Sequence, residues 1–305
     1  MKRSILKNQE LTQTVAEIFK KHDHSINSLN LSRDILLFKY TRPCDLDVAL
    51  YEPVLCLVLQ GKKEMALGGR RLAAGAGESL IVSHAVPIVS KIAEASAGRP
   101  YFALVLNLDL NIIRGLYHDF GELAVTTGGA HALELDKTSP RLLDSLCRLL
   151  NAVLDPADSI VLLPHILREV HYRILQSNHG GMLRSLLRYD SHENGIARAI
   201  SIIRGSFKEA LSVPDLAKQV GMSTSSFYQH FKVVTESTPL QYQKDLRLIE
   251  AQRLLTAEGL SVTSTAYEIG YESPSQFSRE YVRKFGSTPS ADSRQNIHDL
   301  NLRRS

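Results

Sequence analysis

The pattern of apolar and polar positions changes along the 305 residues of this chain. Apolar side chains at helical spacing within 8–22 predict a short N-terminal helix. From about 26 to 112, short apolar runs are separated by Gly, Pro and Asp, which favours a β-sandwich or a small barrel. From about 139 onward the apolar period becomes 3.6 residues, so the remainder of the chain is predicted to be helical.

A stripe of leucines runs through 142–153 and ends before Pro156. Such a stripe packs on the core of its own domain or forms the seam of a dimer, and the sequence leaves both interpretations open. The same periodicity predicts further helices at about 159–177, 181–187, 195–206 and 239–257. The polar segment 189–195 lies between them and is interpreted as a domain boundary.

The last third of the chain contains one small helical pattern twice. Each copy has an alanine four positions before a glycine, a serine shortly after it, and two aromatic residues at i and i+4. The small alanine lets two helices cross closely, the glycine supplies a turn with positive φ, and the serine can cap the next helix. The pattern predicts helix-turn-helix motifs at about 213–234 and 262–285. The residues are Ala217, Gly221, Ser223, Phe227 and Phe231, then Ala266, Gly270, Ser273, Phe277 and Tyr281.

Together with Arg247-Leu248 and the tail Phe285-Gly286-Ser287-Thr288-Pro289, these motifs resemble the DNA-binding domain of AraC/XylS-type regulators. The resemblance covers about the last hundred residues. Thr265 stands where the family usually has an aliphatic residue, and Asp292 where an aromatic one usually precedes the final arginine, Arg294. We expect both departures to loosen the second subdomain slightly.

The resemblance implies two recognition helices that enter successive major grooves about 34 Å apart. Arg279 then suits guanine, while Gln229 and Gln276 suit adenine. Each of these residues could instead be an ordinary solvated side chain. The base-facing positions carried over are Ser225, Tyr228, Gln229, Pro274, Ser275, Gln276 and Arg279, and the expected phosphate contacts are Lys232, Arg283 and Lys284.

The N-terminal half, through the stretch from Tyr51-Glu52-Pro53 to Gln60-Gly61-Lys62 and through Arg99-Pro100-Tyr101, resembles the cupin-like domain of AraC-type regulators. This resemblance implies a jelly-roll barrel with a small-molecule pocket, followed by a helical segment that dimerises. The expected architecture is α+β and multidomain. It comprises an arm at 1–24, a cupin-like sensor barrel at 25–138, a helical linker or dimerisation segment at 139–190, and an all-α DNA-binding domain at 195–298.

Composition changes this interpretation little. The net charge is +4, and residues 195–305 carry 14 Lys and Arg against 11 Asp and Glu, which is only mildly basic for a nucleic-acid binder. No apolar stretch approaches the roughly 18 residues of a membrane span, and no secretory signal is recognised. Three widely spaced cysteines, Cys44, Cys56 and Cys147, fit a reducing cytoplasm.

Two other functions are compatible with parts of the sequence. A metal-dependent cupin enzyme needs clustered ligands, but 79–90 offers only His84, and His165 and His171 lie six residues apart. We therefore expect no catalytic residue, metal or cofactor. Redox or electrophile sensing could act through Cys44, because the neighbouring Arg42 would lower its thiol pKa, whereas Cys56 lies in an apolar run and is expected to be an inert core thiol.

The sequence thus predicts a cytoplasmic transcriptional regulator, nucleoid-associated when bound to DNA. Its expected partners are double-stranded DNA, a second copy of the chain, an unidentified small-molecule effector and, if it activates, RNA polymerase. The sequence does not identify the effector, the operator or the pocket lining.

Overall fold

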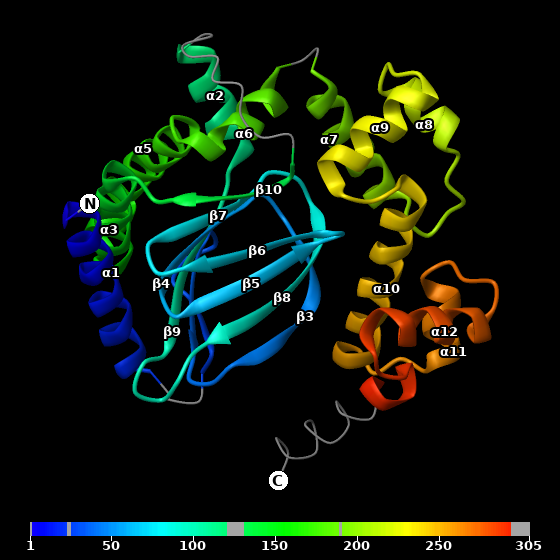
Figure 1. Ribbon diagram of the computed structural model, residues 1–305, viewed down its shortest axis with the longest axis horizontal. Coiled ribbons are helices and arrows are strands. Elements are labelled where there is room, and N and C mark those ends of the chain that lie inside the picture. The colour runs from blue at the N-terminus through cyan, green and yellow to red at the C-terminus, as the bar shows by residue number, and fades with distance from the viewer. Residues whose placement is uncertain (1, 23–25, 121–130, 189–190, 294–305) are drawn as a thin grey trace. The chain divides into compact units, whose positions relative to one another are not determined.

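The computed structural model describes residues 2–22, 26–120, 131–188 and 191–293. It divides into two compact units, one built mainly from residues before Gly195 and the other mainly from residues after it. The first is a β-sheet domain with covering helices, and the second is all-helical (Figure 1). The α+β multidomain fold predicted from the sequence is confirmed. Arg294 and the predicted domain end at 298 lie outside the described residues.

The first unit contains two antiparallel sheets. One has six strands in the order β1-β2-β9-β4-β7-β10, and the other has four in the order β3-β8-β5-β6. The strands are β1 (Ser28–Asn30), β2 (Ile35–Tyr40), β3 (Cys44–Tyr51), β4 (Val54–Gln60), β5 (Lys62–Leu67), β6 (Arg70–Gly75), β7 (Glu78–Val82), β8 (Val86–Glu94), β9 (Tyr101–Asn107) and β10 (Leu133–Lys137).

The central strand β4 is buried on both faces, which explains its unbroken apolar run. Leu55, Leu57 and Leu59 join the core cluster that includes the helices. Alternation along the strand therefore directs Cys56 and Val58 to the opposite face, toward the interior between the two sheets. The β-unit thus has one core under its helices and a second buried interior between its sheets.

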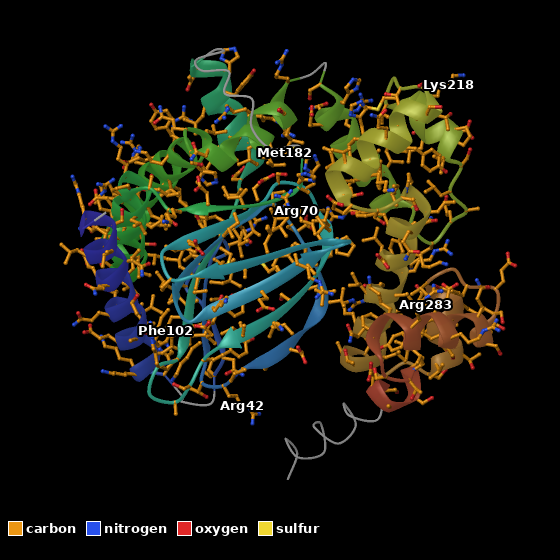
Figure 2. The ribbon with its side chains drawn as sticks, in the orientation of Figure 1. Arg42, Arg70, Phe102, Met182, Lys218 and Arg283 are labelled. Atoms are coloured by element: carbon orange, nitrogen blue, oxygen red, sulfur yellow. The ribbon has the colours of Figure 1, made fainter. Side chains whose placement is uncertain are left out.

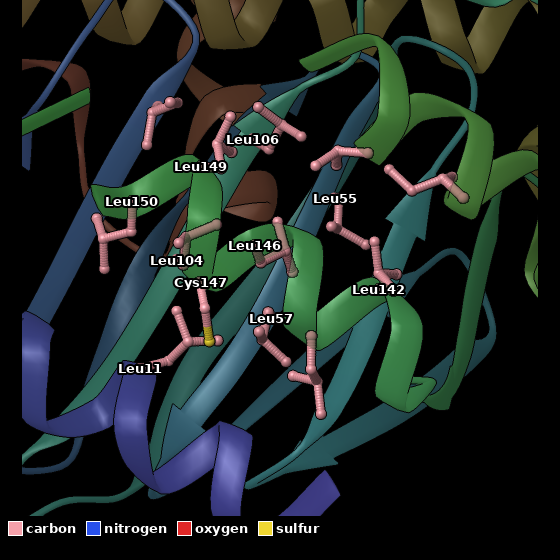
Figure 3. Packing of buried hydrophobic residues seen from close by; sticks show 14 of the residues in the cluster. Leu11, Leu55, Leu57, Leu104, Leu106, Leu142, Leu146, Cys147, Leu149 and Leu150 are labelled. Atoms are coloured by element: carbon pink, nitrogen blue, oxygen red, sulfur yellow. The ribbon is translucent and has the colours of Figure 1, made fainter. Parts of the chain in front are cut away.

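Helices α1 (Lys2–Lys20), α3 (Pro140–Leu154) and α5 (Leu163–Leu175) cover the six-stranded sheet (Figure 1). Figure 3 shows Leu146 and Leu149 of α3 among Leu55 of β4 and Leu104 of β9, while Leu11 of α1 packs in the same cluster. The leucine stripe at 142–153 is therefore core, so of the two interpretations left open by the sequence, packing on its own domain is correct and a dimer seam along these leucines is not. The stripe faces its own barrel because that sheet exposes a complementary apolar face.

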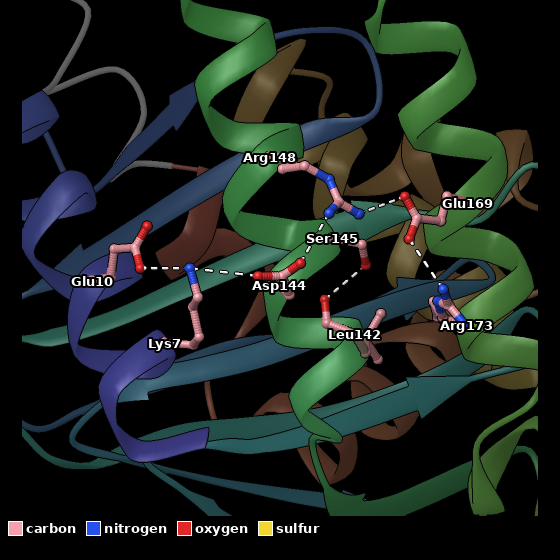
Figure 4. Close-up of polar contacts among 8 residues, drawn as sticks. All are labelled: Lys7, Glu10, Leu142, Asp144, Ser145, Arg148, Glu169 and Arg173. Carbon is pink, nitrogen blue, oxygen red and sulfur yellow. Dashed lines mark hydrogen bonds and ion pairs between the residues drawn. The ribbon is translucent and has the colours of Figure 1, made fainter. Parts of the chain in front are cut away.

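The opposite side of α3 is polar. Lys7 of α1 lies 2.9 Å from Glu10 and 3.5 Å from Asp144, and Arg148 pairs with Asp144 and with Glu169 of α5 (Figure 4). These partly exposed pairs contribute little stability individually, but they give the helical layer a solvated outer surface.

Several helix boundaries differ from the expectations. The predicted helix at 159–177 is two helices, α4 (Pro156–Val161) and α5, because Pro164 lies in the first turn of α5 and favours a helix start. Helix α2 (Leu110–Phe120) and strand β10 were not predicted at all. The N-terminal helix begins at Lys2 instead of residue 8. The segment Asn178–Gly180 forms a 3₁₀ turn, and α6 (Gly181–Leu187) follows as expected.

The second unit consists of six helices within the described residues. Helix α7 (His192–Gly205) begins three residues earlier than predicted, inside the segment interpreted as a linker. The pairs α8 (Val213–Gln219) with α9 (Thr224–Thr235), and α11 (Val262–Glu268) with α12 (Pro274–Phe285), are joined through the long helix α10 (Pro239–Ala257). The two predicted helix-turn-helix segments and the long helix thus lie within a residue or two of the expected positions.

Candidate nucleic-acid interface

Both helix-turn-helix copies have the local geometry that their sequence predicts. Gly221 and Gly270 adopt φ of +77° and +84°, a left-handed conformation that favours glycine over residues with a Cβ. The hydroxyl of Ser223 accepts a hydrogen bond from the Ser226 amide at 3.2 Å, and that of Ser273 accepts from the Gln276 amide at 3.4 Å. Each serine therefore caps the helix that follows its turn.

Aromatic side chains fix both recognition helices to their cores. Phe227 and Phe231 are fully buried, and Tyr242 of α10 meets Phe231 edge-to-face at 5.6 Å between ring centroids. In the second copy, Phe277 and Tyr281 are equally buried and lie 5.5 Å apart. Because these anchors occupy one side of each helix, the residues between them are directed outward.

In α9, the outward side carries polar residues and no arginine. Every candidate of this helix is exposed, and Ser225 and Gln229 can donate and accept hydrogen bonds. Lys232 adds a single positive charge in the last turn. Among the described residues, Lys232 has no ion-pair partner. The exposed residues are Ser225, Tyr228, Gln229 and Lys232.

In α12, the outward side is more basic. Arg279 and Arg283 are exposed, and no described carboxylate pairs with either guanidinium. Figure 2 marks Arg283 on this helix. Ser275 and Gln276 are also exposed, whereas Pro274 at the helix start is only partly so. A free guanidinium on an outward helical face can take guanine in bidentate fashion or hold a phosphate.

Two of the α12 candidates are engaged within the protein. Lys284 Nζ lies 2.9 Å from Asp245 Oδ1, and its side chain is only 21% exposed. Gln276 Nε2 donates to Glu280 Oε1 at 3.3 Å. Lys284 is therefore placed to tie α12 to α10, which competes with the phosphate contact expected from the sequence.

Glu280 organises the side of α12 that faces α10. It accepts hydrogen bonds from the Tyr271 hydroxyl at 2.7 Å and from Lys244 Nζ at 3.0 Å. Burial alone would raise the pKa of Glu280, but these hydrogen bonds lower the pKa below its usual value. A pocket of about 290 Å³ lies beside it, and its lining includes two cations, Lys244 and Arg247, together with the carboxylates of Glu272 and Glu280.

Arg247 connects the two helix-turn-helix subdomains, a role that the sequence did not reveal. Its guanidinium donates to the carbonyl oxygens of Phe207 at 2.7 Å, Lys208 at 3.0 Å and Glu209 at 2.9 Å, all in the segment after α7. It also donates to Gly270 O at 2.9 Å, in the turn of the second motif. One side chain on α10 thereby holds parts of both subdomains in a fixed arrangement.

The two departures from the expected family pattern have different outcomes. Thr265 is fully buried, and its hydroxyl has no hydrogen-bond partner among the described residues. Asp292, in contrast, accepts from the Tyr281 hydroxyl at 2.6 Å and from Ser287 Oγ at 2.9 Å. Asp292 therefore braces the recognition helix, contrary to the expectation that it loosens the subdomain.

His84 and His171, two histidines that the sequence offers as possible metal ligands, make hydrogen bonds within the protein. Burial lowers the pKa of His84 to about 4, so the ring is neutral near pH 7, and its Nδ1 lies 2.9 Å from Ser83 Oγ. His171 uses both ring nitrogens, with the Asp109 amide at 2.9 Å and Leu167 O at 2.7 Å. Across the described ranges, no group of three or more His, Cys, Asp or Glu could hold a metal ion.

The alternative of redox or electrophile sensing through Cys44 is not favoured. Burial raises the pKa of Cys44, and Arg42 opposes this without reversing it, so the prediction of a lowered thiol pKa is wrong. Cys56 is buried, in agreement with its interpretation as a core thiol. Cys147 is also buried, and burial raises its pKa to about 11.

Both units of the chain match known protein families. Residues 33–182 match the family described as AraC-type transcriptional regulator N-terminus, and residues 216–295 match a helix-turn-helix domain family. The chain belongs to the AraC family of transcriptional regulators. No described helix of this AraC-family protein is long and apolar enough to cross a membrane.

Individual relatives agree with this assignment. The activator RclR of Escherichia coli is 38% identical over 91 residues, which are 30% of this chain and 32% of RclR. CdhR of Pseudomonas aeruginosa is 30% identical over 36% of this chain and 33% of CdhR, so these matches span about a third of each relative. The thermoregulatory protein LcrF of Yersinia pestis is 24% identical over 85% of this chain and 95% of LcrF.

Among solved structures, ToxT from Vibrio cholerae has a similar fold. One ToxT structure covers 86% of this chain and 98% of ToxT, with a TM-score of 0.57 and 11% sequence identity. A second, with bound unsaturated fatty acid, aligns with a TM-score of 0.54 over 87% of this chain and 96% of ToxT, also at 11% identity. At this identity the likeness describes the fold.

Proposed function

We propose that this AraC-family protein binds specific DNA sequences through both helix-turn-helix motifs and regulates transcription in response to a small molecule held by its N-terminal unit. The observation that carries the proposal is the pair of capped, core-anchored helices with polar outward faces. Helix α10 has 19 residues, so it is about 28 Å long at 1.5 Å per residue. That length is close to the roughly 34 Å between successive major grooves on one DNA face.

The residues divide by expected role. In the second motif Arg279 contacts guanine, with Ser275, Gln276 and Pro274 at neighbouring base-facing positions. In the first motif Ser225, Tyr228 and Gln229 read their half-site through hydrogen bonds and shape. Lys232 and Arg283 contact phosphate, which positions the protein without reading sequence. Lys284 could join them only by leaving Asp245.

The N-terminal unit is the proposed sensor. A ligand can change DNA binding only if it has different affinities for two states of the protein. The N-terminal unit would bind the ligand more tightly in one of these states and so shift the protein toward that state. The fold relative ToxT has been solved with an unsaturated fatty acid bound, which supports small-molecule binding by a protein of this fold. We further infer that the protein is cytoplasmic and associates with the nucleoid through DNA. It would act as a homodimer by binding rather than by catalysis, and it would contact RNA polymerase if it activates.

The test is genomic footprinting with the tagged full-length protein, followed by gel-shift titration on the recovered site and on random DNA. Arg279→Ala should weaken binding to the recovered site more than to random DNA. Arg253→Ala is the matched control, because Arg253 is an exposed α10 arginine paired with Glu250 and Glu258. Equal losses on both DNAs would make Arg279 a phosphate contact, and the absence of any enriched site would refute the proposed function.

A further inference from the structure

A lysine lies in the interior between the two sheets of the N-terminal unit. Lys63 is on β5, whose inward positions Lys63, Met65 and Leu67 are buried while the alternate positions are more exposed. Its side chain is only 7% exposed. Fully buried lysines are rare unless they are paired, so this position calls for a physical explanation.

Among the described residues, Lys63 has a single hydrogen-bonding partner. Its Nζ donates to the Tyr51 hydroxyl at 3.0 Å and lies 5.2 Å from the centre of the Tyr51 ring. The Tyr51 hydroxyl is in turn 3.3 Å from Ser90 Oγ on β8. Within the described residues, no carboxylate lies within ion-pair distance of Lys63. An ammonium group has three donors, so two remain for another partner.

Two neighbouring lysines of the same sheet have carboxylate partners, which Lys63 lacks among the described residues. Lys91 on β8 is 2.9 Å from Glu64, and Lys62 on β5 is 3.7 Å from Glu94, and all four side chains are well exposed. The outer lysines thus have carboxylates although water already solvates them. The inner lysine has none, although an unpaired buried charge is far more costly than an exposed one.

The groups around Lys63 are suited to an anion. The cluster comprises a cation together with phenol, hydroxyl and thiol groups, and it lacks a described carboxylate. Burial by itself lowers the pKa of Lys63, but the electrostatic effects of Cys56 and Tyr51 outweigh it, so the pKa is raised. Tyr101 and Tyr40 lie close by, with ring centroids 6.3 Å apart, and add aromatic surface.

We propose that the interior of this barrel binds a small organic acid whose carboxylate pairs with Lys63 Nζ and accepts hydrogen bonds from the Tyr51 and Ser90 hydroxyls. The aromatic and aliphatic side chains of the same interior receive the apolar body of the acid. This proposal rests on the proposed function, and it names the chemical class of the effector. The ion pair forms where water is largely excluded, so the acid should be strongly preferred over an uncharged analogue of the same shape.

The test uses the full-length protein and four acids, namely benzoate, phenylacetate, hexanoate and decanoate, each compared with its primary amide. Calorimetric titration and thermal unfolding are measured for both members of each pair. At least one acid should bind and raise the unfolding temperature by about 5 °C at a hundredfold excess over its Kd. Its amide should bind at least about tenfold more weakly.

Variants then identify the anchor. Lys63→Met should abolish the preference for the acid over the amide, and Tyr51→Phe should reduce it. Lys91→Met is the matched control, because it removes a lysine from the outer face of the same sheet, and it should leave acid binding unchanged. The comparison of acid with amide needs no variant, so it remains decisive if Lys63→Met does not fold.

The proposal is overturned if none of the acids binds, if acid and amide bind equally, or if Lys63→Met keeps the preference. Gel shifts on the same samples separate this result from the proposed function. Specific DNA binding without any acid binding would refute the assignment of the effector class alone. Acid binding by a protein that recognises no DNA site would instead refute the proposed function as a transcriptional regulator.

Discussion

The two helix-turn-helix copies share a backbone design but differ in what surrounds it. Both turns have a glycine with positive φ, both recognition helices are capped by serine, and both are anchored by two buried aromatic residues. Their outward faces differ, because α12 carries Arg279 and Arg283 while α9 carries one lysine among uncharged residues. Similar folding motifs can therefore read DNA in different ways.

The copies also differ in their support. A Cβ added at Gly221 would meet nothing within 4 Å, whereas one at Gly270 would approach Lys208 O to 2.2 Å. The turn of the second copy is thus packed against the segment after α7, where Arg247 also donates its hydrogen bonds. The first turn is free on that side, so equivalent substitutions in the two copies should have unequal effects.

The largest difference is expected at the two turn glycines. Gly221→Ala introduces only backbone strain, which costs about 1–2 kcal/mol in a left-handed conformation. Gly270→Ala adds a collision with the backbone oxygen of Lys208, so its cost should exceed about 3 kcal/mol. Chemical denaturation of the two variants measures this difference. Equal destabilisation would mean that the contact at Gly270 does not form.

The next largest effect is expected at Asp292, which occupies the position of Tyr242 in the first copy, where an aromatic ring packs on Phe231 instead. Asp292→Ala removes the buried carboxylate that accepts hydrogen bonds from the Tyr281 and Ser287 hydroxyls, so the free energy of unfolding should fall by about 2 kcal/mol. Asp292→Asn keeps one carbonyl oxygen and should lose less. Denaturation followed by tyrosine fluorescence reports the change, and a neutral Asp292→Ala would show that Asp292 does not brace α12.

The two copies should also differ in how much DNA affinity is lost when an outward side chain is removed. Arg279→Ala should weaken specific binding by about 1–3 kcal/mol and relax the preference at one base pair. Ser225→Ala in the first helix should cost less, because it removes a single hydroxyl contact, whereas Arg279→Ala removes a bidentate guanidinium contact. Competition binding against operators with single substitutions measures both. A larger effect at Ser225 would reverse the proposed division between the copies.

The smallest effect is a gain in stability. Thr265→Val keeps the shape of a fully buried side chain and removes a hydroxyl that has no described hydrogen-bond partner. We expect the second subdomain to become more stable by about 1 kcal/mol, visible as a rise in the unfolding midpoint. The equivalent position of the first copy is Leu216, already aliphatic, so Leu216→Val is a control that should destabilise. Destabilisation by Thr265→Val would mean that the hydroxyl has a partner such as water.

Features encoded over a few residues were predictable from the sequence. The glycine turns, serine caps and aromatic anchors of both motifs depend on spacings within about ten residues, and the structure has all of them. Helix α2 was not predicted because β-type apolar runs extend to about residue 112, although Ile113 and Leu116 have helical spacing and are buried. The break before α5 was missed although Pro164 marks it.

Features that depend on contacts distant in sequence were not predictable. The leucine stripe of α3 could have faced a partner or its own sheet, and only the packing against β4 and β9 distinguishes the two. Likewise, strand register was needed to see that Lys63 faces inward. The role of Arg247 depends on carbonyl groups from two separate turns, which no local pattern brings together.

We propose that one chain reads two neighbouring major grooves with two unequal helices. The most direct measurement is the consensus of sites bound by the purified full-length protein, determined by selection from random duplex DNA. We expect two sequence blocks centred about 10 base pairs apart, with a guanine in the block that loses its preference in Arg279→Ala. A consensus with a single block, or two blocks that Arg279→Ala leaves unchanged, would contradict this proposal.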